Sequence, residues 1–164
     1  TKLCIEQLGK YLTGTETVLD VGCGSGILSI IAAKLGAGQV FGVDIDPLAV
    51  EASVENCRVN HIPETQAAFM RGDVIGDAEF PEKMAQEKGS LPQYDIVVAN
   101  ILADVIIPLS ATVAPYMKPD GFFISSGIIN TKEEAVRQAL LDNGFEIIET
   151  THMKDWVSFT AKQK

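Results

Sequence analysis

Cysteine is scarce in this sequence, and its spacing carries no site. The 164 residues include only Cys4, Cys23 and Cys57, none of which forms a C-x-x-C pair. An odd count without such a pair indicates neither a disulfide framework nor a zinc site, and it suits a reduced, cytoplasmic compartment. No other residue cluster implies a metal.

Positive charge is also in short supply. Lys and Arg number 13 against 22 Asp and Glu, which gives a formal net charge of −9. This balance argues against direct binding of nucleic acid, because no cationic surface is available to displace counterions from the phosphates. It is compatible with a basic protein partner.

Long apolar runs and a signal-peptide pattern are missing as well. The longest weakly charged stretch, residues 96–117, is interrupted by Asn100, Asp104, Pro108 and Pro115. It predicts a buried strand followed by a helix rather than a membrane span. Hydrophobic residues still make up 46% of the chain, which suits one globular domain and argues against disorder.

What the sequence does contain is an alternation of apolar runs with helical patterns. Strands are predicted at 17–21, 39–44, 67–71, 94–99 and 121–126, and helices at the start of the chain and at 26–37, 48–60 and 101–117, the last bent at Pro108. Such an alternation predicts a doubly wound, mostly parallel α/β sheet with helices on both faces.

The remaining segments complete this expected fold. Thr131 and Glu134 form a T-x-x-E pattern that predicts a capping box, opening a helix that ends at Gly144. Residues 145–153 and 156–162 predict a C-terminal antiparallel hairpin, which brings the sheet to seven strands. The polar segment 77–93 predicts a surface excursion with about one helical turn.

The most informative motif is V-L-D-V-G-C-G-S-G, residues 18–26. A predicted strand runs into Gly22, Gly24 and Gly26, with Cys23 between the first two, and a predicted helix follows. Glycines let a ligand approach the main chain, and free N–H groups at a helix start attract an anionic group. The G-x-G-x-G spacing differs from the dinucleotide G-x-G-x-x-G, and the absence of G-K-[ST] excludes a P-loop.

Carboxylates stand beside this loop at three predicted strand ends. Asp20 precedes the first glycine and suits a cationic ligand, such as a sulfonium. Asp44 ends the second strand, where its carboxylate can accept both hydroxyls of a ribose. Gly72-Asp73 ends the third strand, where Asp73 can accept from an adenine amino group. Asp46 precedes Pro47 and is interpreted as a helix cap.

This combination resembles the class I S-adenosylmethionine-dependent methyltransferases over essentially the whole chain. The resemblance implies a Rossmann-like methyltransferase fold with a reversed last strand, and S-adenosyl-L-methionine as the cofactor. The cofactor-binding residues that it implies are Asp20, Gly22, Cys23, Gly24, Gly26, Asp44, Ile45, Gly72, Asp73 and Asn100.

The fourth predicted strand ends in A-N-I-L-A, residues 99–103, across the sheet from the glycine loop. Related amino-methylating enzymes carry N-P-P-Y or D-P-P-Y here, and its absence argues against a planar nucleobase as target. By resemblance, Asn100 and the main-chain carbonyl of Ile101 or Leu102 are the catalytic groups that orient a substrate nitrogen. Asn100 is also a candidate helix cap, and both roles stay open.

The A-N-I-L-A segment sharpens the resemblance when taken with K-P-D-G-F-F-I-S-S-G-I-I (118–129) and D-W-V-S-F (155–159). Together they resemble the catalytic domain of the bacterial ribosomal protein L-eleven methyltransferase family. That family methylates lysine side chains and the N-terminal amine of a large-subunit ribosomal protein, so the expected partner is a basic ribosomal protein. Residues 1–164 are expected to form a single catalytic domain.

The chain opens on Thr1 directly in a helix-like pattern, after the point where that family carries an F-G-T-G-x-H-x-T-T motif. We therefore expect a piece of a longer protein that lacks the family's N-terminal substrate-docking domain. Two alternatives to the ribosomal substrate stay open. One is a class I methyltransferase acting on another protein, an RNA or a small molecule, and the other is a cofactor-binding module without turnover. A nicotinamide dehydrogenase is disfavoured by the glycine spacing.

Other candidate residues receive structural interpretations. His61 and His152 are expected to be structural or surface residues, and Cys23 a small side chain at a crowded turn rather than a nucleophile. Trp156 is expected to pack the hairpin against the sheet, with a place in the amine pocket as the alternative. Ser126-Gly127 either contacts the substrate side or makes a turn into the next helix.

Overall fold

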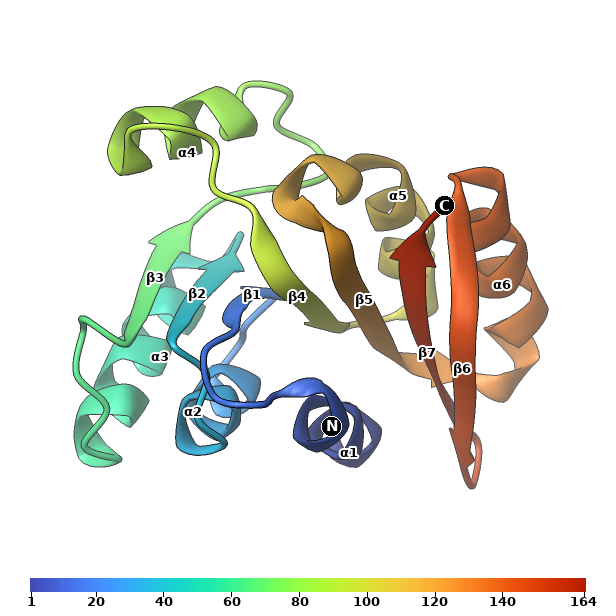
Figure 1. Ribbon diagram of the computed structural model, residues 1–164, viewed down its shortest axis with the longest axis horizontal. Coiled ribbons are helices and arrows are strands. Elements are labelled where there is room, and N and C mark those ends of the chain that lie inside the picture. The colour runs from blue at the N-terminus through green and yellow to red at the C-terminus, as the bar shows by residue number, and fades with distance from the viewer.

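The strands form a single sheet in the computed structural model, which describes residues 1–164 (Figure 1). Their order across the sheet is β3-β2-β1-β4-β5-β7-β6. The first five are mutually parallel, and β7 runs antiparallel to both β5 and β6. The strands are β1 (Thr17–Val21), β2 (Gln39–Asp44), β3 (Ala67–Arg71), β4 (Tyr94–Asn100), β5 (Met117–Ile129), β6 (Phe145–Met153) and β7 (Trp156–Gln163).

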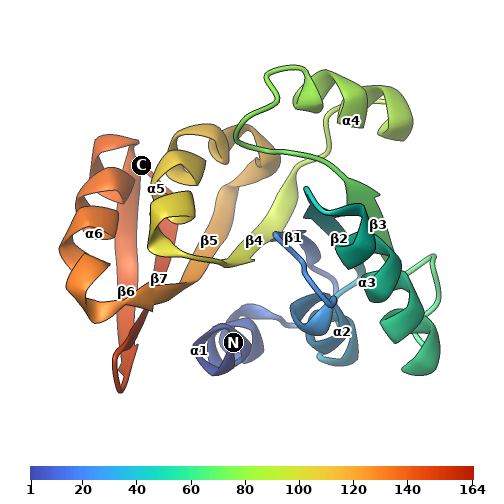
Figure 2. The same cartoon turned by 180° about the vertical axis from the view of Figure 1, so that it is seen from behind.

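Six α-helices cover the two faces of the sheet. Figure 1 and the reverse view in Figure 2 place α1, α2 and α3 on one side and α4, α5 and α6 on the other. No helix is long and apolar enough to cross a membrane. The helices are α1 (Lys2–Tyr11), α2 (Ile27–Lys34), α3 (Pro47–Val59), α4 (Phe80–Lys88), α5 (Ala103–Thr112) and α6 (Glu133–Asp142).

Two separate hydrophobic clusters result from the alternation of side chains along each central strand. In β1, Val18 belongs to the cluster under α1 to α3, whereas Leu19 belongs to the cluster under α4 to α6. Ile96 and Val97 of β4 divide in the same way. Because successive side chains of a strand point to opposite faces, a nearly continuous apolar run marks a strand covered on both sides. The predicted doubly wound fold and the C-terminal hairpin are confirmed.

Two local predictions were wrong. The segment 77–93 is more than a surface excursion, because it contains the nine-residue helix α4, which buries Phe80 and Met84 in the core. The predicted capping box at Thr131 and Glu134 does not form. Residues Asn130–Lys132 make a 3-10 turn instead, so α6 starts at Glu133 after Lys132, without a side-chain cap.

The strand order places a topological switch between β1 and β4. From β1 the chain proceeds outward to β2 and β3, and then returns to the other side of β1 to form β4 and β5. In open α/β sheets of this kind, ligands bind beyond the carboxyl ends of the strands at the switch. The loops after β1, β2, β3 and β4 therefore converge on one region.

Candidate functional site

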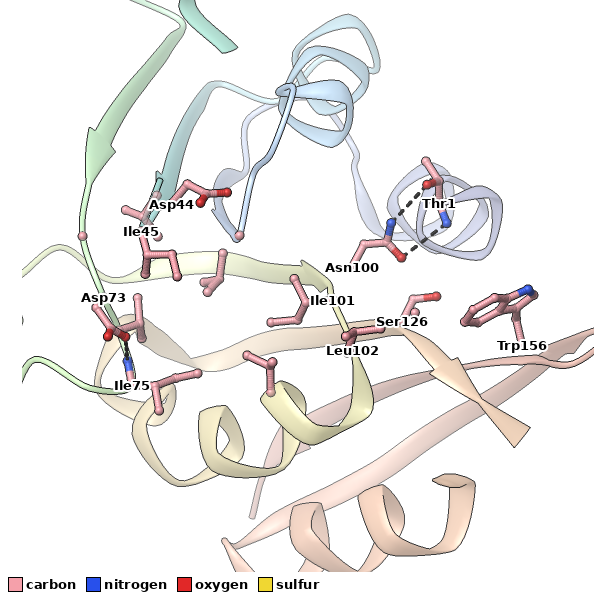
Figure 3. Close-up of a pocket in the computed structure, with 17 residues that line it drawn as sticks. Thr1, Asp44, Ile45, Asp73, Ile75, Asn100, Ile101, Leu102, Ser126 and Trp156 are labelled. Atoms are coloured by element: carbon pink, nitrogen blue, oxygen red, sulfur yellow. Dashed lines mark hydrogen bonds between the residues drawn. The ribbon is translucent and has the colours of Figure 1, made fainter. Parts of the chain in front are cut away.

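A cavity of about 610 Å³ lies at the carboxyl ends of the central strands. Figure 3 shows Asp44, Ile45 and Asp73 toward one end and Asn100, Ser126 and Trp156 toward the other. Its size is typical of a pocket for a small-molecule ligand. Of the residues that the sequence singled out for catalysis or cofactor binding, those that line it are Gly22, Asp44, Ile45, Gly72, Asp73, Asn100, Ile101 and Leu102.

The glycine loop after β1 adopts a conformation that needs its glycines. Gly22, Gly24 and Gly26 have φ angles of 71°, 56° and 81°, in the left-handed region that other residues rarely adopt. Only Gly22 lines the cavity. Gly24 and Gly26 shape the loop behind it, and a Cβ at Gly26 would come within 3.1 Å of the Cα of Ser53 in α3.

Asp44 ends β2 and ties the glycine loop in place. Its Oδ2 accepts a hydrogen bond from the Gly24 N–H at 2.9 Å, and its Oδ1 accepts one from the Asp46 N–H at 3.0 Å. A carboxylate offers about four acceptor positions, so capacity remains for a ligand in the cavity. Asp46 caps α3 by accepting from the Leu48 N–H, which confirms its interpretation as a helix cap.

Asp20 does not face the cavity, contrary to the prediction of a carboxylate beside a cationic ligand. Only 1% of the residue is exposed, and its Oδ2 accepts hydrogen bonds from the Ser29 N–H at 3.1 Å and the Ser29 hydroxyl at 2.6 Å. Burial raises its pKa to about 6. Strand alternation turns Asp20 toward α2, where it fixes the start of that helix to β1.

Cys23 is likewise outside the cavity. It is buried, and its Sγ lies 3.5 Å from the Ser53 hydroxyl. Burial raises the pKa of its thiol to about 12, so the reactive thiolate is not populated near neutral pH. Its interpretation as a small side chain at a crowded turn is confirmed.

The turn after β3 brings Gly72 and Asp73 to the cavity. Asp73 Oδ1 accepts hydrogen bonds from the N–H groups of Ile75 at 2.9 Å and Gly76 at 2.8 Å, while its Oδ2 accepts none within the protein. A Cβ on Gly72 would collide with the ring of Phe80. Helix α4 therefore packs directly behind this turn.

Asn100 ends β4, and its side chain reaches toward α1 rather than toward α5. Its Nδ2 donates to the Thr1 hydroxyl at 3.0 Å, and its Oδ1 accepts from the Thr1 nitrogen at 3.3 Å (Figure 3). The residue at the N-cap of α5 is Leu102, and no side chain caps that helix. The interpretation of Asn100 as a helix cap is therefore wrong, and its amide stays at the cavity.

The two candidate carbonyl groups differ in availability. The Leu102 carbonyl accepts from the N–H groups of Val105 at 2.9 Å and Ile106 at 3.0 Å, so it belongs to the first turn of α5. The Ile101 N–H donates to the Ser126 carbonyl at 3.1 Å, and the Ile101 carbonyl accepts no hydrogen bond within the protein. Of the two alternatives, Ile101 therefore has the free acceptor, whereas the Leu102 carbonyl is already hydrogen-bonded within α5.

Trp156, Ser126 and Gly127 also line this end of the cavity. Trp156 is 48% exposed, so its expected packing of the hairpin against the sheet is wrong and the alternative position at the pocket is right. Ser126 and Gly127 belong to β5, which continues to Ile129, rather than to a turn into the next helix.

The two histidines lie away from the cavity. His61 is exposed just after α3, and His152 Nε2 lies 2.8 Å from Glu133 Oε2 on the surface. Their expected surface role is confirmed.

The sequence did not point to the apolar part of the lining. Val43, Val74, Ile75 and Val105 line the cavity but fit equally well into ordinary strand or helix patterns. The feature of the sequence that could have identified Val74 and Ile75 is their position directly after the Gly72-Asp73 turn. Together with Ile45, Val74 and Ile75 give the carboxylate end an apolar lining suited to an aromatic ring.

Comparison with known proteins fits this arrangement. The family model described as ribosomal protein L11 methyltransferase (PrmA) matches residues 1–164. The chain belongs to this family. The family predicted from the glycine loop and the A-N-I-L-A segment is thus confirmed.

Relatives named ribosomal protein L11 methyltransferase support the same membership. One from Agathobacter rectalis is 48% identical over 166 residues, covering 99% of this chain and 50% of the relative. One from Lachnoclostridium phytofermentans is 49% identical over 176 residues, covering 99% of this chain and 51% of the relative. The chain spans about half the length of the curated relatives it matches.

Solved structures agree on the fold. The crystal structure of a ribosomal protein L11 methylase from Lactobacillus delbrueckii subsp. bulgaricus matches with a TM-score of 0.86 and 30% identity, covering 99% of this chain and 77% of that one. A putative methyltransferase, SMU.776, solved in complex with SAH, matches with a TM-score of 0.80 at 14% identity, covering 98% of this chain and 48% of that one. The second likeness concerns the fold alone.

Proposed function

We propose that residues 1–164 form the catalytic domain of an S-adenosylmethionine-dependent methyltransferase that modifies amino groups of ribosomal protein L11. One observation carries the proposal. Asn100 and Ile101, whose carbonyl accepts no hydrogen bond within the protein, line the same cavity as Gly22, Asp44 and Asp73. A cofactor site and a nitrogen-orienting site thus share one pocket, as methyl transfer between two bound molecules requires.

The carboxylate end of the cavity fits the parts of S-adenosylmethionine. Asp44 retains acceptor capacity for the two ribose hydroxyls, and the free Oδ2 of Asp73 can accept from the adenine amino group. Ile45 and Ile75 offer apolar faces for the adenine ring, and Gly22 leaves the main chain open to the remainder of the molecule. When bound, the cofactor supplies a methyl group that its sulfonium makes electrophilic.

The other end of the cavity prepares the amine. A lysine with a reference pKa near 10.4 must lose a proton first, which costs about 4–5 kcal/mol at pH 7. Among the residues around Asn100 and Ile101 that line this end, no side chain is an acid or a base. The Asn100 Oδ1 and the Ile101 carbonyl are neutral acceptors for the two N–H groups of a neutral amine, so its lone pair is left to point toward the methyl group.

The names of the relatives and the charge of the chain support the choice of substrate. The curated relatives are named for ribosomal protein L11, and a net charge of −9 favours encounter with a basic protein over a polyanionic RNA. We propose that the reaction takes place in the cytoplasm, on the protein rather than on ribosomal RNA.

The proposal is tested first by calorimetry and then by transfer. The full-length protein is expected to bind S-adenosylhomocysteine and not NAD. With radiolabelled S-adenosylmethionine it is expected to label purified L11 in a mixture of ribosomal proteins. Binding of NAD alone would contradict the cofactor assignment. Binding of S-adenosylhomocysteine without labelling of any protein would leave a cofactor-binding module, and labelling of ribosomal RNA would contradict the proposed substrate.

A further inference from the structure

Gly127 occupies an irregular point of β5, next to the amine end of the cavity. The pairing of β5 with β7 shifts register between Ser125 and Ile128, and Gly127 has a φ of 81°. Such an irregularity in a strand re-aims the backbone locally and is common beside functional sites. Here it brings Gly127 against the backbone of Ile101.

The contact with Ile101 leaves no room for a side chain at position 127. A Cβ built on Gly127 would lie 2.6 Å from the Ile101 carbonyl oxygen and 3.1 Å from its carbonyl carbon and its nitrogen. These are main-chain atoms, which cannot swing away as the end of a flexible side chain can. The preceding residue, Ser126, accepts the Ile101 N–H through its carbonyl. Residues 126–127 therefore contact both main-chain polar groups of Ile101, the N–H through a hydrogen bond and the carbonyl through close packing.

Ile101 is held from the other side by the cofactor loop. A Cβ on Gly22 would lie 2.7 Å from Ile101 Cγ2, so the side chain of Ile101 lies directly on the first glycine of that loop. Two glycines from two different strand ends thus enclose Ile101. Its position, and that of its unpaired carbonyl, is fixed relative to both the loop and β5.

We propose that Gly127 is a positioning residue, whose missing side chain lets the Ile101 carbonyl serve as the second acceptor for the substrate amine beside Asn100. The inference rests on the proposed function. A methyl group at position 127 would displace the Ile101 carbonyl and rotate the adjoining peptide. The amine would then lose one of its two acceptors and part of its alignment, while Asp44 and the carboxylate end would be unaffected.

The test compares Gly127→Ala with Gly144→Ala in the full-length protein. Gly144 has a nearly identical φ of 82°, lies after α6 away from the cavity, and would place its Cβ in open space. Both variants therefore carry the same backbone strain of an alanine at positive φ. Only Gly127→Ala pushes on Ile101. Turnover at saturating cofactor and substrate, KM, affinity for S-adenosylhomocysteine and thermal stability are measured for both.

We expect kcat to be about 100-fold lower in Gly127→Ala than in Gly144→Ala, as a displacement near 1 Å at a reacting group can cause. Affinity for S-adenosylhomocysteine is expected to stay within twofold of wild type in both variants. Equal kcat values in the two variants would overturn the role of Gly127. If the wild-type protein itself neither binds the cofactor nor methylates L11, the proposed function fails instead.

A measurement on the wild-type protein covers the case in which Gly127→Ala does not fold. With a carbon-13 label in the isoleucine carbonyls, the Ile101 resonance is expected to shift when a lysine-containing substrate peptide binds in the presence of S-adenosylhomocysteine. The Ile124 carbonyl, within the sheet, serves as the reference that stays in place. An Ile101 resonance that does not respond to the peptide would overturn the inference.

Discussion

The two ends of the cavity are built from different kinds of atoms. At the β2–β3 end, the carboxylates of Asp44 and Asp73 accept four backbone N–H groups from the loops around them. At the β4–β5 end, the acceptors are the side-chain amide of Asn100 and the main-chain carbonyl of Ile101, and the latter is unpaired within the protein. The acceptors at one end are anionic and already hydrogen-bonded within the protein, whereas the acceptors at the other end are neutral groups, one of which has no partner.

Under the proposed function, this difference assigns cofactor binding to one end and catalysis to the other. The carboxylates hold their loops before any ligand arrives, so the β2–β3 end provides a formed surface for hydroxyl and amino groups. The neutral acceptors of the other end provide no counter-charge for an ammonium, and they pair best with an amine that has already lost its proton. Changes at the first end should therefore act on affinity, and changes at the second end on turnover.

The largest effect is expected from Asn100→Ala. Removal of one positioned acceptor from a reacting group costs about 100- to 1000-fold in rate in comparable sites. The transfer rate at saturating cofactor and substrate, measured with radiolabelled S-adenosylmethionine, should fall by this factor. Because Asn100 does not cap α5, the melting temperature should change little. A rate close to that of wild type would remove Asn100 from the site. Asn60→Ala, at the partly buried C-cap of α3 and outside the cavity, is the control.

Asp20 lies behind the glycine loop, outside the cavity. Its raised pKa leads us to expect that pH changes the stability of the protein through this residue. Its pKa is about 6 in the folded protein against an ordinary value of 3.8, so the folded state holds its proton more tightly than the unfolded state does. The stability that the protonated form contributes is fully present below about 3.8 and is lost as the pH rises through about 6. Above that pH the contribution does not change further.

This effect is measured as a difference between wild type and Asp20→Asn, because other carboxyl groups titrate in the same range. The free energy of unfolding of the wild type should fall relative to that of the variant by about 2 kcal/mol between pH 4 and pH 7. Denaturant titrations at a series of pH values give this difference. If the free energies of unfolding of the two proteins changed in parallel with pH, the raised pKa assigned to the buried Asp20 would be contradicted.

An intermediate effect is expected from Asp44→Ala, which should act on affinity. The substitution removes the proposed ribose acceptor and the carboxylate that accepts the Gly24 N–H, and hydrogen bonds to a charged group contribute about 1.5–3 kcal/mol each. Calorimetry should show S-adenosylhomocysteine binding about 30-fold more weakly.

Asp46→Ala is the matched control for Asp44→Ala. Asp46 also accepts a backbone N–H, but it caps α3 outside the cavity. This variant should lose about 1 kcal/mol of stability and keep its affinity. Equal loss of affinity in both variants would show that Asp44 acts only through the loop.

The smallest effect is expected on the stability of Trp156→Ala. Trp156 is about half exposed, whereas its neighbour Val157 is fully buried between the sheet and its helices. Val157→Ala should cost about 2 kcal/mol, and the removal of the much larger Trp156 side chain should cost less. Denaturant unfolding compares the two. A larger loss for Trp156→Ala would restore its interpretation as the residue that packs the hairpin.

The sequence was most informative about features that are determined by local patterns along the chain. Strand positions, the glycine loop and the placement of Asp44, Asp73 and Asn100 follow from apolar runs that end in polar residues at the same edge of a parallel sheet. These features depend on periodicity and topology, and both can be read along the chain.

The wrong predictions depend on contacts between distant segments. The accommodation of the buried Asp20 carboxylate depends on its hydrogen bonds with Ser29 in α2, and the burial of Phe80 depends on the space behind Gly72. The availability of the Ile101 carbonyl depends on where α5 begins, because that helix occupies the carbonyl of Leu102. None of these contacts leaves a periodic trace in the sequence.

The assignment of affinity to one end of the cavity and of turnover to the other is tested most directly by titrating S-adenosylhomocysteine into the Asn100→Ala variant of the full-length protein. If the carboxylate end sets affinity and the end at Asn100 sets turnover, the dissociation constant of this variant should lie within about twofold of wild type. Its transfer rate should fall by about 100- to 1000-fold. A loss of affinity as large as that of Asp44→Ala would contradict the account, because it would place Asn100 in the cofactor site rather than beside the amine.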